Sequence, residues 1–242
     1  MQCCLNSSAL HSGKGDDVKK LEEKLQYQFK NPALLENALT HSSYANEHRE
    51  DSVPSNERLE FLGDSILGLV VADHLYRTKT DLPEGDLTRI RAALVCEGSL
   101  VEVAGRLNLG SHLKLGKGEL TGGGKDRPSI QADAVEAILA AVYLDGGIGQ
   151  VRKIIRSLIL EQESEKAEAI RDYKTALQEL VQRESGMVLA YTLAGENGPD
   201  HAKFFTMQVQ LNGETIGQGE GKSKKEAEQA AAKVAVEKLK KK

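Results

Sequence analysis

The sequence lacks any long apolar run. No segment approaches the roughly 18 consecutive apolar residues that a membrane-spanning helix needs, so we expect no membrane partner. Residues 1–18 also lack the apolar stretch of a secretory signal and are instead rich in serine, glycine and charge. This composition predicts a disordered extension over residues 1–17.

Cysteine is also scarce. The chain has 242 residues and three cysteines, Cys3, Cys4 and Cys96. A sparse and odd set of cysteines predicts no disulfide framework and fits a reducing compartment, so we expect a cytoplasmic protein. Cys3 and Cys4 are adjacent and lack the two-residue spacer of a zinc ligand pair, which argues against metal binding there.

Strand-like segments are absent before residue 185. Apolar residues recur at helical spacing over most of residues 18–170, interrupted by a glycine-rich loop at Gly110–Arg127. The pattern then changes to a helix, three strands and a helix, with the hairpin signal Asn212-Gly213 between two of the strands. The sequence therefore predicts an all-α N-terminal domain joined to a small α+β domain of order α-β-β-β-α.

The bounds of these elements follow from apolar periodicity and from glycine and proline punctuation. We expect the main helices of the first domain at residues 18–30, 56–76, 87–107, 129–144 and 151–170. We expect strands at residues 190–194, 204–211 and 215–218, between helices at 175–184 and 224–239. The helical domain then covers residues 18–147, a terminal helix and linker residues 148–171, and the α+β domain residues 172–241.

The net charge of −4 would argue against a nucleic-acid binder if the charge were evenly spread. The lysines are segregated, however. Lys222, Lys224 and Lys225 lie close together, and further lysines end the chain at residues 238–242. The average charge therefore hides a basic segment near the C-terminus.

An acidic stripe follows residue 56. Glu57, Glu60 and Asp64 are spaced by three and four residues, which places them on one face of a helix. Like charges at this spacing repel by a few tenths of a kcal/mol per pair. Apolar residues flank the stripe, so a bound cation would explain why the acids are tolerated. Solvated surface acids are the alternative interpretation.

A second acidic pair, Asp133 and Glu136, lies three residues apart in a strongly apolar helix. Carboxylates among apolar neighbours are costly to bury unless they are paired or bound to metal. Two such helices meeting in a bundle would form an oxygen-only site suited to Mg²⁺ or Mn²⁺. The chemistry that such a site favours is phosphoryl transfer by metal-activated water. Nothing in the sequence predicts an organic cofactor.

These acids lie in motifs with a specific resemblance. The run Asn56–Ser65, NERLEFLGDS, resembles the signature of the bacterial ribonuclease III family. Thr40–Tyr44, Glu84–Ala92 and Ala132–Ala137 match further family motifs in the same order and spacing. The resemblance extends from about residue 18 to the C-terminus and implies an all-helical endonuclease that forms a homodimer with one cutting site in each protomer.

The resemblance also implies roles for the acids. Glu60, Asp133 and Glu136 match metal ligands, and Asp64 and Glu136 match the acids required for cleavage. Glu57 and Glu84 match secondary acids that line the catalytic valley on the RNA side. Because no member of this set is missing, the resemblance implies an active enzyme.

The implied reaction is metal-dependent hydrolysis of double-stranded RNA. A metal-activated water attacks the phosphodiester, leaving 5′-phosphate and 3′-hydroxyl ends, and paired cuts leave short 3′ overhangs. The resemblance further implies processing of ribosomal RNA precursors and structured messengers. Phe61 is either a knob into the second protomer or a core residue.

The α-β-β-β-α segment resembles a double-stranded RNA-binding domain. Such domains contact 2′-hydroxyls in two minor grooves and the phosphates between them. The matching positions are Thr175, Gln178, Glu179, His201, Lys222, Ser223, Lys224 and Lys225. Lysines at a helix N-terminus oppose the helix dipole but attract an anion.

Alternatives remain from the residues alone. A non-catalytic RNA-binding regulator would keep the same two domains, and a small-molecule phosphohydrolase would keep only the metal chemistry. Gly116–Arg127 could cradle phosphate with its amides and with Lys117, Lys125 and Arg127, or it could simply be a flexible loop. His41 and His74 could be ligands or structural residues.

Overall fold

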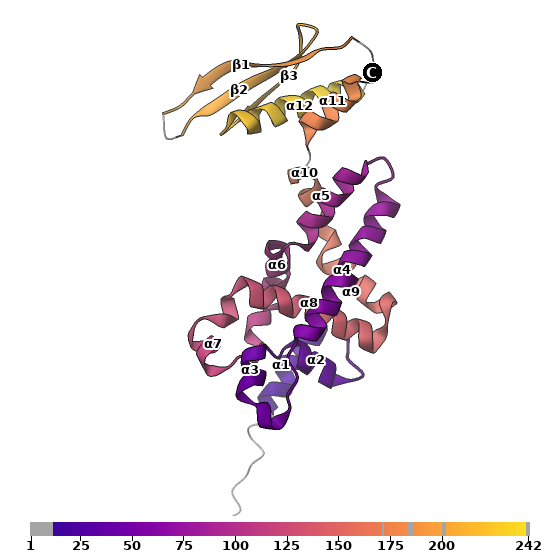
Figure 1. Ribbon diagram of the computed structural model, residues 1–242, viewed down its shortest axis with the longest axis vertical. Helices are drawn as coiled ribbons and strands as arrows, with labels where there is room; N and C mark the ends of the chain where they lie inside the picture. The colour runs from indigo at the N-terminus through magenta and orange to yellow at the C-terminus, as the bar shows by residue number, and fades with distance from the viewer. Residues whose placement is uncertain (1–11, 171, 183–185, 200–201, 241–242) are drawn as a thin grey trace, which may run out of the picture. The chain divides into compact units, whose positions relative to one another are not determined.

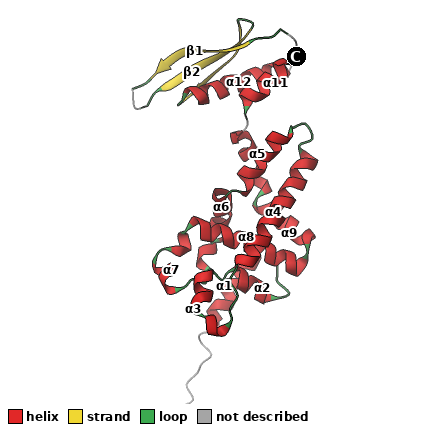
Figure 2. Cartoon of the chain, viewed as in Figure 1, coloured by secondary structure: helices red, strands yellow, loops and turns green. Residues whose placement is uncertain are grey.

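The chain forms two compact units that divide between Ile170 and Arg171. The computed structural model describes residues 12–170, 172–182, 186–199 and 202–240. Among these residues, helices make up the first unit and the strands occur only in the second (Figures 1 and 2). The predicted fold class, an all-α domain followed by an α-β-β-β-α domain, is confirmed. No helix in the described part of the chain is long and apolar enough to cross a membrane.

The first unit contains ten α-helices within its described residues. They are α1 (Ser12–Leu25), α2 (Pro32–Ala38), α3 (Ser42–Glu47), α4 (Glu57–Thr78), α5 (Glu84–Val95), α6 (Glu97–Leu107), α7 (Lys117–Thr121), α8 (Pro128–Gly146), α9 (Ile148–Leu158) and α10 (Glu163–Ile170). Short 3₁₀ turns join several of them, at Arg49–Asp51, Leu109–Ser111, Gly124–Asp126 and Leu160–Gln162.

Helix α8 is the centre of this unit and packs against α2, α4, α6 and α9 (Figure 1). Most of its residues are apolar, and its middle is buried on every side, as expected for a core helix. Helix α4 makes its main packing contact with α8. The two acidic segments predicted from the sequence therefore lie on helices that pack against each other.

Helices α4 and α8 approach most closely at Gly63. A Cβ atom at this position would lie 1.9 Å from the backbone carbonyl oxygen of Glu136, far inside van der Waals contact. Only glycine fits there without moving one helix. The contact holds Glu60, one turn before Gly63, beside the part of α8 that carries Asp133 and Glu136.

The start of α4 is fixed by Asn56, which is 3% exposed. Its backbone amide donates to the carbonyl of Thr40 at 2.8 Å, and its side-chain amide donates to the carbonyl of Ala38 at 3.3 Å. These bonds attach the beginning of the acidic helix to the connection between α2 and α3. Two contacts thus hold the acids of α4 in place: the hydrogen bonds of Asn56 before Glu57, and the close approach to α8 at Gly63.

Two predicted helices are each divided in the structure. The segment predicted as one helix over residues 87–107 breaks at Cys96, whose backbone is extended with φ −68° and ψ 157°. The segment predicted over 151–170 becomes α9, a 3₁₀ turn and α10, with the break at Ile159. Ile159 is 1% exposed, so burial of its side chain determines the backbone there.

Two predicted loops are partly helical. The glycine-rich segment Gly110–Arg127 includes α7 and a 3₁₀ turn. Helix α1 begins at Ser12, so the predicted extension over residues 1–17 is too long by six residues, and residues 1–11 lie outside the described residues. Core residues such as Leu21 anchor this helix, so its first turns extend an existing helix and need no nucleation of their own.

The second unit is a three-stranded antiparallel sheet covered on one face by two helices (Figure 1). Its elements are α11 (Tyr173–Gln182), β1 (Leu189–Asn197), β2 (Phe204–Leu211), β3 (Glu214–Gly221) and α12 (Lys224–Lys240). The predicted turn at Asn212-Gly213 joins β2 to β3, and both residues have positive φ, 51° and 87°. Those angles match the hairpin turn that the sequence predicted.

Changing Gly63 to Ala should destabilise the first unit by about 1–3 kcal/mol, the usual cost of an overpacked contact. The control is Gly68→Ala in the same helix, where an added Cβ meets nothing within 4 Å. That control should be neutral or stabilising by up to about 1 kcal/mol, because alanine is the better helix former. Urea denaturation followed by circular dichroism measures both, and equal effects would contradict the close-contact argument.

Candidate active site

Three carboxylates from two helices converge beside the Gly63 contact. Glu60 comes from α4, while Asp133 and Glu136 come from consecutive turns of α8. One oxygen from each lies within 4.8 Å of one oxygen from each of the others. Among the described residues this is the one group of three acidic, histidine or cysteine side chains close enough to hold a metal ion.

Glu136 carries the largest electrostatic perturbation in the group. Burial raises its pKa, and the charges of Asp64, Glu60 and Asp133 raise it further, to about 7. Near neutral pH, this carboxyl is therefore a mixture of protonated and ionised forms when nothing else is bound. A nearby cation would favour the ionised form and lower its pKa.

The other two members show the same direction of shift. Burial raises the pKa of Glu60, followed by the charges of Asp133, Asp64 and Glu57. Burial also raises the pKa of Asp133, although His41 acts in the opposite direction. The cluster therefore concentrates negative charge that the neighbouring protein groups do not neutralise.

Asp64 and Glu57 flank the three carboxylates but are not members of the close group. Both side chains are exposed, and each raises the pKa of Glu60 through its charge. Glu57 also accepts a hydrogen bond from the hydroxyl of Ser55 at 2.9 Å. The structure thus brings Asp64 and Glu57 to the edge of the cluster, where solvent or substrate can reach them.

Glu84 is not brought to the cluster within one chain. It is the first residue of α5, which follows the C-terminal end of α4 (Figure 1). Eighteen residues of α4 separate Glu60 from that end, roughly 27 Å of helix. Glu84 is exposed and accepts a hydrogen bond from the hydroxyl of Thr88 at 2.8 Å. Its role as a secondary acid remains a prediction.

The two candidate histidines have structural partners. His41 caps α3, because its Nδ1 accepts the backbone amide of Ser43 at 3.2 Å. His74 Nε2 lies 2.6 Å from a carboxylate oxygen of Glu163. Neither histidine belongs to the group of possible metal ligands.

The amides that begin α7 are already occupied. The amide of Gly116 donates to the hydroxyl of Ser43 at 2.9 Å, and that of Lys117 donates to a carboxylate oxygen of Glu47 at 2.8 Å. A phosphate would therefore have to displace a carboxylate. The hypothesis of a phosphate-binding glycine loop is not supported, although Lys117 and Lys125 are exposed.

On α11, the predicted RNA-binding side chains of Thr175, Gln178 and Glu179 are exposed. Thr175 also helps to begin the helix, because its hydroxyl donates to Asp172 at 2.9 Å. Its backbone amide donates to the second oxygen of Asp172 at 3.1 Å. His201, the remaining candidate outside the last helix, lies outside the described residues.

At the start of α12, Lys222, Lys224 and Lys225 are exposed. Ser223 has a capping role: its hydroxyl accepts the amide of Glu226 at 3.2 Å, while Glu226 accepts the amide of Lys222 at 2.9 Å. The arrangement resembles a capping box, except that the glutamate accepts the amide of Lys222, one residue before the cap, instead of the amide of Ser223. Ser223 was predicted to contact RNA, and the structure gives it this helix-capping contact as well.

The sequence alone gave no reason to select Glu97. This residue begins α6, and its negative charge raises the pKa of Asp133. No spacing relates Glu97 to the other acids, since it comes from a third helix. Only the tertiary structure reveals it.

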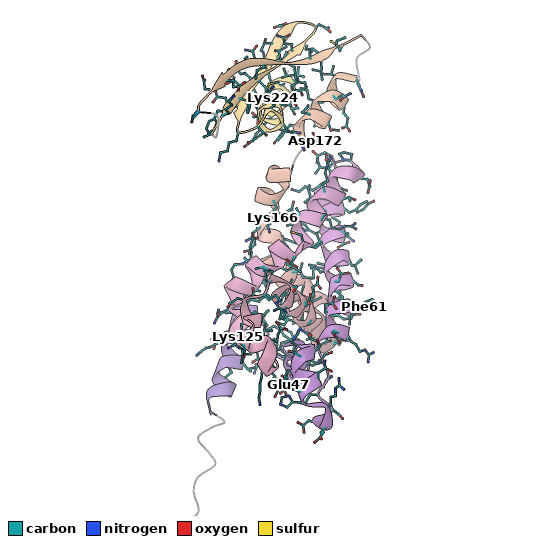
Figure 3. The ribbon with its side chains drawn as sticks, turned by 60° about the vertical axis from the view of Figure 1, so that its left-hand side comes forward. Glu47, Phe61, Lys125, Lys166, Asp172 and Lys224 are labelled. Atoms are coloured by element: carbon teal, nitrogen blue, oxygen red, sulfur yellow. The ribbon has the colours of Figure 1, made fainter. Side chains whose placement is uncertain are left out.

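An apolar stripe lies on the solvent side of α4. Phe61 is 74% exposed and projects from the outer side of that helix (Figure 3). Leu69 and Tyr76, at spacings of eight and seven residues, are 61% and 77% exposed. Phe61 is therefore not a core residue of the isolated chain, and its contact with a second protomer stays a prediction.

Comparison with known proteins assigns both units. The family model described as ribonuclease-III-like matches residues 31–163, and the model of the double-stranded RNA binding motif matches residues 173–239. The chain is 53% identical to Ribonuclease 3 of Caldanaerobacter subterraneus subsp. tengcongensis over 221 residues, 90% of this chain and 96% of that protein. It is 46% identical to Ribonuclease 3 of Listeria monocytogenes over 222 residues, 91% of this chain and 97% of that protein.

A solved structure agrees with these relatives. The nuclease domain of ribonuclease III from Campylobacter jejuni is 43% identical, with a TM-score of 0.56 and coverage of 60% of this chain and 96% of that domain. The family model spans more than half of the chain, and the relatives span nearly all of it. The chain therefore belongs to the ribonuclease III family and is a double-stranded RNA endoribonuclease.

Proposed function

We propose that Glu60, Asp133 and Glu136 hold a divalent cation, Mg²⁺ or its substitute Mn²⁺, for hydrolysis of double-stranded RNA. The observation that carries this proposal is the convergence of three carboxylate oxygens within 4.8 Å, with the pKa of all three groups raised. Hard cations with oxygen ligands suit such a set, and soft metals that prefer sulfur or nitrogen do not.

The residues around the cation divide the remaining work. When bound, the cation supplies an acidified water and neutralises charge on the phosphate. Asp64 is exposed at the edge of the cluster, where its carboxylate would be placed to orient an attacking water. Glu57 lies on the same helix face and would contact the RNA side. The products would be 5′-phosphate and 3′-hydroxyl ends.

We further propose that the enzyme acts as a homodimer through the exposed stripe of α4. Phe61, Leu69 and Tyr76 expose large apolar side chains about two turns apart along one side of α4, which a second copy would bury. Two sites related by a two-fold axis would cut both strands of a duplex and leave short 3′ overhangs. Glu84 lies far from the carboxylate cluster of its own chain. In the dimer, it would reach the catalytic valley of the second copy.

The second unit would capture the duplex. Exposed Thr175, Gln178 and Glu179 on α11, and Lys222, Lys224 and Lys225 at α12, offer hydrogen bonds and positive charge. Such a surface suits the 2′-hydroxyls and phosphates of A-form RNA. We propose ribosomal RNA precursors, transfer RNA precursors and structured messengers as substrates, in the cytoplasm.

Glu136→Gln should abolish cleavage of perfect duplex RNA while leaving its affinity within about twofold of wild type, because the carboxylate serves the metal and not RNA capture. Cleavage in Mg²⁺ and filter binding in Ca²⁺ measure the two properties. Glu23→Gln is the matched control, since Glu23 is exposed on α1. Equal loss of binding and cleavage would count against a metal role.

Stability of the metal-free protein should fall as pH rises from about 4.5 to about 7. Over that interval the unfolded state has already released the Glu136 proton, and the folded state still holds it, because the folded pKa is about 7. Glu136→Gln should remove most of this decline. Thermal melts at pH 5 and pH 8 in the presence of a chelator measure this decline. An identical pH dependence in wild type and Glu136→Gln would contradict the raised pKa of Glu136 as its cause.

Replacing Lys222, Lys224 and Lys225 with alanine should reduce the slope of log K against log salt by roughly two to three, if each lysine neutralises one phosphate. Binding affinity measured at several salt concentrations between about 50 and about 300 mM gives this slope. The single variant Lys224→Ala is also compared with Lys238→Ala, which removes the same charge near the other end of α12 and serves as its control. An unchanged slope in the triple variant would refute phosphate contact.

A further inference from the structure

Helix α10 is the last element before the RNA-binding unit. It spans Glu163–Ile170 and packs against α5. Eight residues are too few for a helix to be stable by itself in water. The sequence predicted one helix over residues 151–170, within a terminal helix and linker at 148–171, and the compact nuclease unit extends to Ile170. The contacts that order α10 therefore decide where the tether to the next unit begins.

The first of these contacts is made by Glu163, which is 8% exposed. One of its carboxylate oxygens lies 2.6 Å from Nε2 of His74, and the other lies 2.7 Å from Nζ of Lys79. His74 lies near the C-terminal end of α4, and Lys79 is the cap residue that follows this helix. Burial by itself would raise the pKa of Glu163, but hydrogen bonds and charge from Lys79 and His74 lower it overall.

The second contact is made one turn later by Lys166, labelled in Figure 3. Its ammonium donates to the hydroxyl of Ser99 at 2.7 Å and to a carboxylate oxygen of Glu102 at 3.0 Å. Ser99 and Glu102 belong to α6, and Ser99 is 2% exposed. Ala167 also packs against the main hydrophobic core. Helix α10 is thus joined to two different helices of the nuclease unit.

We propose that Glu163 and Lys166 form a clamp that sets the length of the tether between the nuclease unit and the RNA-binding unit. With α10 docked, residues 171 and 172 alone separate it from α11. With α10 released, the tether grows by the eight residues of that helix. Glu163 and Lys166 are positioning residues, because they act on RNA capture only through the position of the tether.

The change in reach is large. Three peptide steps between Ile170 and Tyr173 span at most about 10 Å, whereas eleven steps from Gln162 span about 38 Å. Once a tether is long enough to let both units engage one duplex, the effective concentration of the tethered module falls roughly as the −3/2 power of further tether length. Release of α10 therefore lowers it roughly sevenfold. The kinetic consequence rests on the proposed capture of duplex RNA by the second unit, but the docking of α10 does not.

Hydrogen exchange on the full-length protein without RNA tests the clamp itself. Amides of residues 166–170 should be protected in wild type and should exchange at least tenfold faster in Glu163→Gln and in Lys166→Ala. Glu161→Gln, at an exposed position two residues before Glu163, should leave protection unchanged. Equal exchange in wild type and both clamp variants would overturn the proposal. Lys166→Ala keeps the test valid if Glu163→Gln fails to fold.

Cleavage kinetics on long duplex RNA test the consequence. Both clamp variants should raise KM several-fold, about sevenfold in the limit above, with kcat unchanged. Inserting eight Gly/Ser residues after Ile170 in the wild-type background should raise KM equally while α10 stays protected. If the clamp variants raise KM and the insertion does not, Glu163 acts through the nuclease unit. That result would overturn the tether role. Failure of wild type to cleave would refute the proposed function alone.

Discussion

The contact between Gly63 and the carbonyl of Glu136 is the constraint on which the acidic site depends. It brings two helix backbones closer than any side chain allows, so Glu60 and the acids of α8 share one small space. A wider crossing would separate the carboxylates and relieve their repulsion. Asn56 adds a second anchor by attaching the start of α4 to the chain before α3. The site is therefore built into the packing of the core and not into a loop.

That position has an energetic cost. Carboxylates near a hydrophobic core lose hydration, and their mutual charge raises their pKa values, most of all that of Glu136. The surrounding helix compensates with apolar burial, since most of the central residues of α8 are fully covered. A protein without need of a cation would gain stability from neutral residues here. The retained repulsion is the physical reason to expect that a cation both stabilises the fold and activates the site.

The second unit uses small residues in the same way. Gly217, Gly219 and Gly221 occupy alternate positions of β3, and a Cβ on any of them would lie within 2.6 Å of the backbone of α12. Alanines of that helix, including Ala231 and Ala235, fill the facing surface. The close approach fixes the start of α12, where the exposed lysines lie. In both units, backbone contact at glycine positions the side chains that we propose to act on RNA.

The sequence by itself determined the features that depend on neighbours along the chain. The spacing of Glu57, Glu60 and Asp64 predicted one acidic helix face, and Asn212-Gly213 predicted the hairpin, because helix and turn geometry are local. Only the tertiary structure decided the break at Ile159, the occupation of the α7 amides by Glu47, and the approach of Glu97 to Asp133. Those features join residues far apart in sequence, and no periodicity records a contact between separate helices. For the same reason the helix predicted over residues 151–170 gave no sign that the part after Ile159 forms a separate helix, held by the partners of Glu163 at the end of α4.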